Sequence, residues 1–70
     1  MDTITHSEMR AELKRQVIAA GGVMVFARMH GISHSNLSEA LSGRRLISET
    51  IAYACGYLAQ TSFKKIREAA

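Results

Sequence analysis

Residues 27–45 of the 70-residue chain read ARMHGISHSNLSEALSGRR, and this stretch decides the fold. It predicts two short helices joined by a tight turn at Gly31, with Gly43 and two arginines just past the second helix. Gly31 stands where the chain must turn with positive φ, which a Cβ would penalise. The positions where the two helices meet hold small or apolar residues, namely Ala27, Ile32, Leu37 and Leu41. The pattern predicts a helix-turn-helix unit over about residues 23–42.

Length and composition indicate a single small domain over residues 1–70. Domains of this size bury only about 60% of their unfolded surface, and those without staples often gain stability by oligomerising. The single cysteine, Cys55, allows no intramolecular disulfide, and its place on an apolar stripe favours a buried side chain over a metal ligand or nucleophile. No apolar run reaches the roughly 20 residues that span a bilayer, and the N-terminal residues of the sequence lack the apolar h-region of a signal peptide. We therefore expect a cytoplasmic protein without a membrane, metal or cofactor partner.

The charge of the chain is unevenly distributed. Its net charge is +3, yet residues 1–43 carry four basic and four acidic groups and are neutral. Residues 44–70 carry five basic and two acidic groups, so the whole positive excess lies after the second helix of the predicted helix-turn-helix unit. A modest basic bias of this kind fits a polyanionic partner.

Four helices are predicted from apolar periodicity and capping signals. The first covers about residues 6–20, with Thr5 and Glu8 as a capping box and Gly21 as its stop. The second runs from about residue 23 to 30, and the third covers about residues 34–42 after the N-cap Ser33. The fourth begins after Ser48, has Ile51, Ala54 and Cys55 on its inner stripe, and is closed by Gly56.

The C-terminal segment, residues 57–70, allows two interpretations. Alternation of side chains and the β-prone Thr61 and Phe63 favour an extended segment, whereas Ser62 as a cap would begin a short helix with Phe63 and Ile66 inward. We favour the extended form. A lone strand would need a partner from another subunit, so this tail is a candidate dimerisation segment.

The third predicted helix has two different faces. At 100° per residue, its hydroxyl-bearing and charged side chains gather on one side, and Leu37, Ala40 and Leu41 gather on the opposite side. A polar face can be simply solvated. The flanking Gly31 and Gly43-Arg44-Arg45 favour a face that contacts DNA.

The chain resembles the Cro/CI family of lambda-type phage repressors over about residues 21–57. The residues that carry this resemblance are Gly22, Phe26, Ala27, Gly31, Ile32, Ser33, Leu37, Ser38, Leu41, Gly43, Arg44, Arg45, Ile51, Gly56 and Tyr57. The resemblance implies a mainly α, four-to-five-helix, lambda-repressor-like domain with a C-terminal strand or short helix. It also implies a dimeric, sequence-specific transcriptional regulator, most often a repressor, that binds double-stranded operator DNA with an inverted repeat and reads the major groove with the helix at about 34–42.

The resemblance assigns roles to particular side chains. It implies that His34, Ser35, Ser38 and Glu39 face base edges. It implies that Ser33, Arg44 and Arg45 contact phosphates, and Lys64 in the tail would add phosphate attraction. Many members carry a glutamine at the start of the second helix, where this chain has Gly22 or Val23. Few of the reading residues make a bidentate purine contact, so we expect water-mediated contacts and DNA shape to supply much of the specificity.

A second hypothesis is a protein-interaction module of antitoxin-like or anti-regulator type with secondary DNA binding. In that case the tail would capture the partner or donate a strand to it. An enzyme is not expected, because the sequence has no paired carboxylates, phosphate loop or nucleophile constellation.

Overall fold

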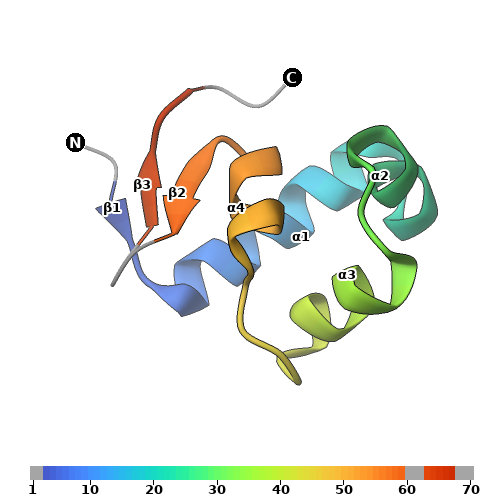
Figure 1. The fold of residues 1–70 in the computed structure, drawn as a ribbon, viewed down its shortest axis with the longest axis horizontal. Coiled ribbons are helices and arrows are strands. Elements are labelled where there is room, and N and C mark those ends of the chain that lie inside the picture. The colour runs from blue at the N-terminus through green and yellow to red at the C-terminus, as the bar shows by residue number, and fades with distance from the viewer. Residues whose placement is uncertain (1–2, 60–62, 68–70) are drawn as a thin grey trace.

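Four helices and three short strands make up residues 3–59 and 63–67, the part of the chain that the computed structural model describes (Figure 1). Their order is β1 (Thr3–Ile4), α1 (His6–Ala20), α2 (Val23–His30), α3 (His34–Ser42), α4 (Glu49–Ala54), β2 (Tyr57–Ala59) and β3 (Phe63–Lys65). The fold is mainly helical, as predicted, and each of the four helices lies where the sequence places it.

Helix α1 has the predicted signals at both ends. Thr5 Oγ1 accepts a hydrogen bond from the Glu8 backbone N–H at 3.3 Å, and Glu8 Oε1 accepts one from the Thr5 backbone N–H at 2.9 Å. Gly21, with φ 111°, ends the helix in the left-handed region. The buried apolar residues of α1 are Met9, Leu13 and Val17. The capping box and the apolar stripe predicted for this helix are therefore confirmed.

Helix α4 also starts at its predicted cap. Ser48 Oγ accepts a hydrogen bond from the Ile51 backbone N–H at 3.2 Å. The helix ends at Ala54, Cys55 is its C-cap, and Gly56 (φ 91°) then turns the chain into β2. The predicted inner stripe is confirmed, because Ile51, Ala54 and Cys55 are all buried.

The sheet corrects the prediction made for the tail. Its strand order is β1-β3-β2, and both pairings are antiparallel. Phe63 of β3 pairs with Ile4 on one side and with Ala59 on the other. The extended form was right, but the expectation that it needs a strand from another subunit was wrong. The alternative helix through Phe63 is wrong as well, and its proposed cap, Ser62, lies outside the described residues.

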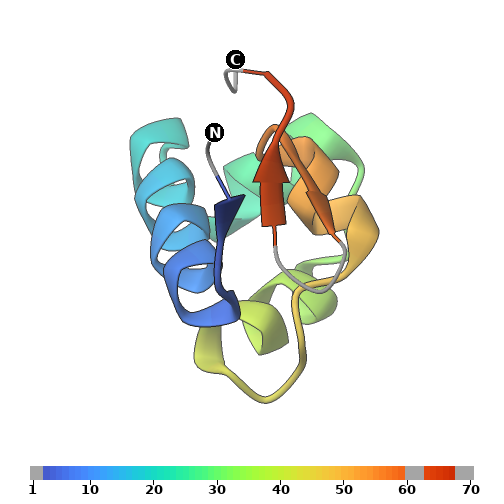
Figure 2. The same ribbon diagram turned by 90° about the vertical axis from the view of Figure 1, so that its left-hand side faces the viewer.

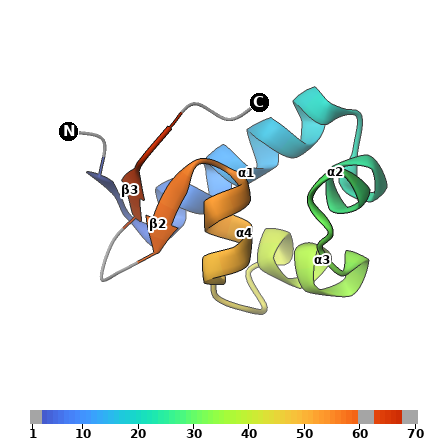
Figure 3. The same ribbon diagram turned by 45° about the horizontal axis from the view of Figure 1, so that its top comes forward.

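The sheet closes one end of the core. Figure 2 looks onto the strands, with α1 beside β1 and α4 beside β2. Phe63 is fully buried against the helices, together with Met9, Leu13, Leu37, Ile51 and Cys55. Figures 1 and 3 show the sheet and α3 on opposite sides of α4, so neither the sheet nor α4 covers the outer face of α3.

Candidate nucleic-acid interface

The α2–α3 pair is set by one left-handed residue. Gly31 has φ 64° and ψ 36°, and the backbone N–H of Ile32 then donates to the Ala27 carbonyl at 2.9 Å. Apart from its two chain neighbours, no described residue has an atom within 4 Å of a Cβ built on Gly31, so the demand for glycine comes from the backbone conformation and not from crowding. Ala27 is buried and Ile32 is half-buried against the core, which fixes the angle at which α3 leaves the turn.

Ser33 begins α3. Its Oγ accepts a hydrogen bond from the Asn36 backbone N–H at 3.4 Å, while its carbonyl accepts one from the Leu37 N–H at 3.0 Å. Ser33 is exposed, and its hydroxyl, which accepts in the cap, can also donate its hydrogen to a phosphate oxygen. The cap and the expected phosphate contact are thus compatible in one side chain.

The two faces of α3 differ in burial as the periodicity predicts. Leu37 and Ala40 are fully buried. On the opposite side, His34 and Ser35 are exposed, and Ser38 is half-buried. The helix therefore presents a short polar row that starts at its N-terminal end, where the positive end of the helix dipole also favours an anion.

Glu39 and Arg45 bond to each other, which the sequence reasoning missed. Arg45 Nε donates to Glu39 Oε1 at 2.8 Å, and the Arg45 Nη2 atom also lies 2.8 Å from that oxygen. Their side chains are 40% and 56% exposed, respectively. They lie six positions apart and the left-handed Gly43 (φ 86°) lies between them, so no helical spacing rule would pair them. The pair cancels one of the two arginine charges that were expected to contact phosphate.

Arg10 is a second residue that the sequence reasoning missed. Although it belongs to α1, its Nε donates to the Ala40 carbonyl of α3 at 3.0 Å in a partly buried contact. Its guanidinium also lies beside Gly43, 3.9 Å from the place a Cβ would occupy. A cation at the C-terminal end of a helix offsets the partial negative charge of the last carbonyls, so Arg10 anchors the end of α3.

The other predicted phosphate ligands fall into two places. Arg44 is exposed directly after α3, and its backbone N–H donates to the Glu39 carbonyl at 3.0 Å. Lys64 lies in β3, on the far side of α4 from α3 (Figure 1). Seven of the predicted residues thus lie on α3 or next to its ends, namely Ser33, His34, Ser35, Ser38, Glu39, Arg44 and Arg45. Lys64 lies in the sheet, away from this helix.

Cys55, considered above as a nucleophile or metal ligand, is a buried free thiol. Burial raises its pKa to about 12, and the nearby Glu12 carboxylate acts in the same direction. A thiol in this state is a poor nucleophile at neutral pH. Among residues 3–59 and 63–67, no three His, Cys, Asp or Glu side chains gather in a way that could hold a metal ion. In the same residues, no helix has the length and apolar character needed to cross a membrane.

Comparison of the chain with models of protein families, with curated proteins and with solved structures found no match. Its function is therefore inferred from its residues and their geometry.

Proposed function

We propose that the protein is a sequence-specific DNA-binding regulator of transcription, a dimeric repressor that lays α3 in the major groove. The observation that carries this proposal is the exposed polar row of α3, backed by a buried apolar face and followed directly by exposed Arg44. The resemblance to Cro/CI repressors over residues 21–57 supports the same conclusion and adds the lambda-repressor-like class of fold.

Base contacts in this proposal come from the first turns of α3. His34 and Ser35 are the most exposed of the reading side chains, and Ser38 lies one turn further along the same face. Hydroxyls donate or accept with little base preference, and an imidazole makes one bond at a time. Specificity then depends on water-mediated contacts and DNA shape as well as on direct contacts.

Phosphate contacts position the helix. Ser33 and the N-terminal N–H groups of α3 face one strand, and Arg44 contacts the backbone beyond the helix. Two subunits with their α3 helices about 34 Å apart would bind successive major grooves on one side of the duplex and occlude a promoter. Glu39, held by Arg45, limits which bases approach this end of α3, because a carboxylate accepts from cytosine N4 but repels phosphate.

The test is the salt dependence of binding. We would titrate the full chain against random-sequence duplexes by fluorescence anisotropy at several salt concentrations. Arg44→Ala should weaken binding to every sequence and lower the slope of log K against log salt by about one. The control, Arg15→Gln, removes a cation of α1 that is ion-paired with Glu12, so its charge is already compensated and the slope should stay unchanged.

Base reading is tested separately by Ser35→Ala, which should change the preference among duplexes of different sequence more than the average affinity. If Arg44→Ala and Ser35→Ala both bind every duplex as the wild type does, the placement of α3 on DNA is wrong.

A further inference from the structure

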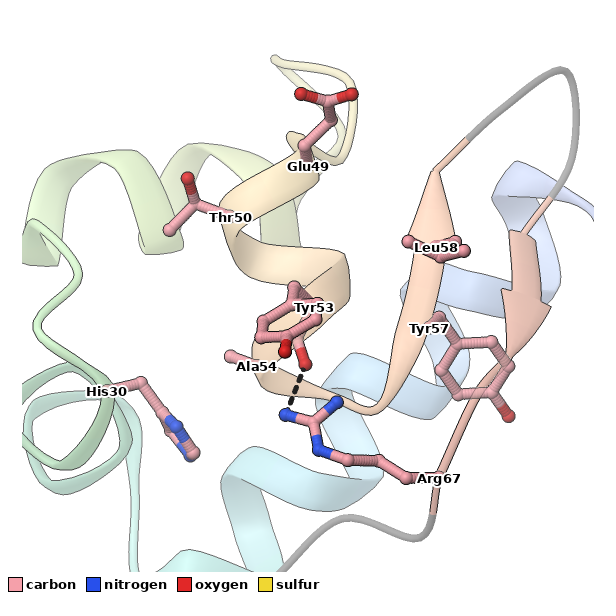
Figure 4. A pocket seen from close by; sticks show the side chains of 8 residues that line it. All are labelled: His30, Glu49, Thr50, Tyr53, Ala54, Tyr57, Leu58 and Arg67. Carbon is pink, nitrogen blue, oxygen red and sulfur yellow. Dashed lines mark hydrogen bonds between the residues drawn. The ribbon is translucent and has the colours of Figure 1, made fainter.

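A groove beside α4 is lined by none of the residues assigned to DNA contact. It has a volume of about 580 Å³, and its lining includes His30, Glu49, Tyr53, Leu58 and Arg67 (Figure 4). These residues come from the end of α2, from α4, from β2 and from the segment after β3. We refer to it as the α4 groove.

The α4 groove exposes side chains that are typical of the centre of a protein interface. Tyr53 is 56% exposed and Leu58 is 40% exposed. The guanidinium of Arg67 lies 4.5 Å from the centre of the Tyr53 ring and donates a hydrogen bond to the Tyr53 carbonyl at 2.7 Å. Tyrosine and arginine are enriched at interface hot spots, and an arginine already held in place loses little freedom on binding.

The α4 groove carries one acidic and one basic side chain, and their positions indicate what kind of partner would fit it. Glu49 begins α4, and Arg67 lies over the other end of this helix, at the Tyr53 carbonyl. Figure 4 shows the two charges at opposite ends of the groove with Tyr53 between them. A groove with an acid at one end and a base at the other is complementary to itself, because a two-fold axis through its middle brings each end against the opposite end of the other copy.

We infer that a second copy of this chain docks in the α4 groove, with Glu49 of each subunit facing the partner's Arg67 and the two Tyr53 side chains near the axis. DNA fits the groove poorly because the Glu49 carboxylate would repel phosphate. A strongly acidic or basic partner would meet one like charge. This inference deepens the proposed function, which needs a dimer, but its test contains no DNA, so either can fail without the other.

Charge reversal tests the two-fold pairing directly. By sedimentation equilibrium, the wild-type chain should form a dimer of twice its 7.7 kDa mass. Glu49→Arg alone and Arg67→Glu alone should each raise the dimer dissociation constant about tenfold or more, because like charges then meet twice per dimer. An equimolar mixture of the two variants should recover a dimer, because both cross-contacts in the mixed pair join opposite charges.

Apolar contacts are tested by a matched pair of variants. Leu58→Ser in the groove should weaken the dimer, and Ile18→Ser, at a residue that is 70% exposed and outside the groove lining, should not. Circular dichroism melts establish that each variant is folded. A wild-type chain that stays monomeric overturns the inference, as does a dimer that tolerates both charge reversals or a mixture that remains monomeric.

Discussion

Gly31 joins α2 to α3 through a conformation that other residues adopt at a cost. Its φ of 64° lies in the left-handed region, and a Cβ there would meet open space. We predict that Gly31→Ala lowers the free energy of unfolding by about 1 kcal/mol, with a smaller loss for Gly31→Asn, because asparagine tolerates this region better. Urea unfolding followed by circular dichroism measures both. Equal stability of the alanine variant and the wild type would contradict the left-handed turn.

The Glu39–Arg45 pair gives a residue-scale prediction about binding that rests on the proposed function. Exposed ion pairs contribute about 0–1 kcal/mol, so neither partner is needed for folding. Glu39→Gln removes a negative charge from the DNA-facing side and frees Arg45. It should therefore tighten binding to random duplexes and steepen the salt slope by about one. Arg45→Gln alone should change the slope little, because its charge is already compensated.

The double variant Glu39→Gln/Arg45→Gln completes this cycle. It should return the salt slope to the wild-type value, since the freed arginine is then absent. A Glu39→Gln variant with an unchanged slope would show that Arg45 does not reach phosphate even when released.

At the scale of single elements, α3 is held by a contact from a distant helix. Arg10 of α1 donates to the Ala40 carbonyl at 3.0 Å. We predict that Arg10→Met lowers the free energy of unfolding by about 1 kcal/mol, because the partly buried carbonyl loses its charged donor. The matched control is Lys14→Met, one turn along α1 at an exposed position, which should stay within about 0.5 kcal/mol of the wild type. Equal losses in the two variants, measured by urea unfolding, would show that Arg10 does not anchor α3.

The helices were predictable because their signals are local. The Thr5–Glu8 capping box, the Ser33 and Ser48 caps and the glycines at the helix ends lie within a few residues of the boundaries they set. Apolar spacing along α1 and α4 then predicted which faces are buried. The same periodicity predicted the polar face of α3, where most of the candidate site residues lie.

The sheet was predictable only in part. The β2–β3 pairing is local, and it was missed because residues 57–66 were interpreted as one extended segment and not as two strands that pair with each other. The β1–β3 pairing joins residues that are far apart in the sequence. β1 is two residues long, and its partner β3 lies at the other end of the domain. Alternation indicated an extended tail, but no local signal identified Thr3 and Ile4 as the strand that pairs with it. The Arg10–Ala40 and Glu39–Arg45 contacts were missed for a similar reason, since they bridge separate elements or a turn.

For the whole molecule, the buried thiol of Cys55 predicts how stability changes at high pH. Burial raises its pKa from 9.0 to about 12, so the unfolded chain loses this proton first. The free energy of unfolding should therefore fall as pH rises above about 9 and continue to fall toward 12. Urea unfolding at pH 8 and pH 10 should show a smaller decrease for Cys55→Ala than for the wild type. Identical decreases would contradict the buried, protonated thiol.

At the scale of the whole molecule, the two proposals use two different surfaces. α3 carries the polar row and Arg44, and the α4 groove carries the self-complementary charges of Glu49 and Arg67. β2 and β3 pair within one chain and Phe63 is fully buried, so these strands of the tail contribute to the fold of their own subunit. A regulator built this way would pair through one surface and bind DNA with the other.

The measurement that tests the central claim most directly is selection of bound duplexes from a random DNA library by the full chain at moderate salt. A dimeric reader should enrich an inverted repeat whose half-sites lie about one helical turn apart, and Ser35→Ala should alter the enriched half-site. Recovery of DNA without an enriched sequence, or no recovery at all, would contradict sequence-specific reading by α3.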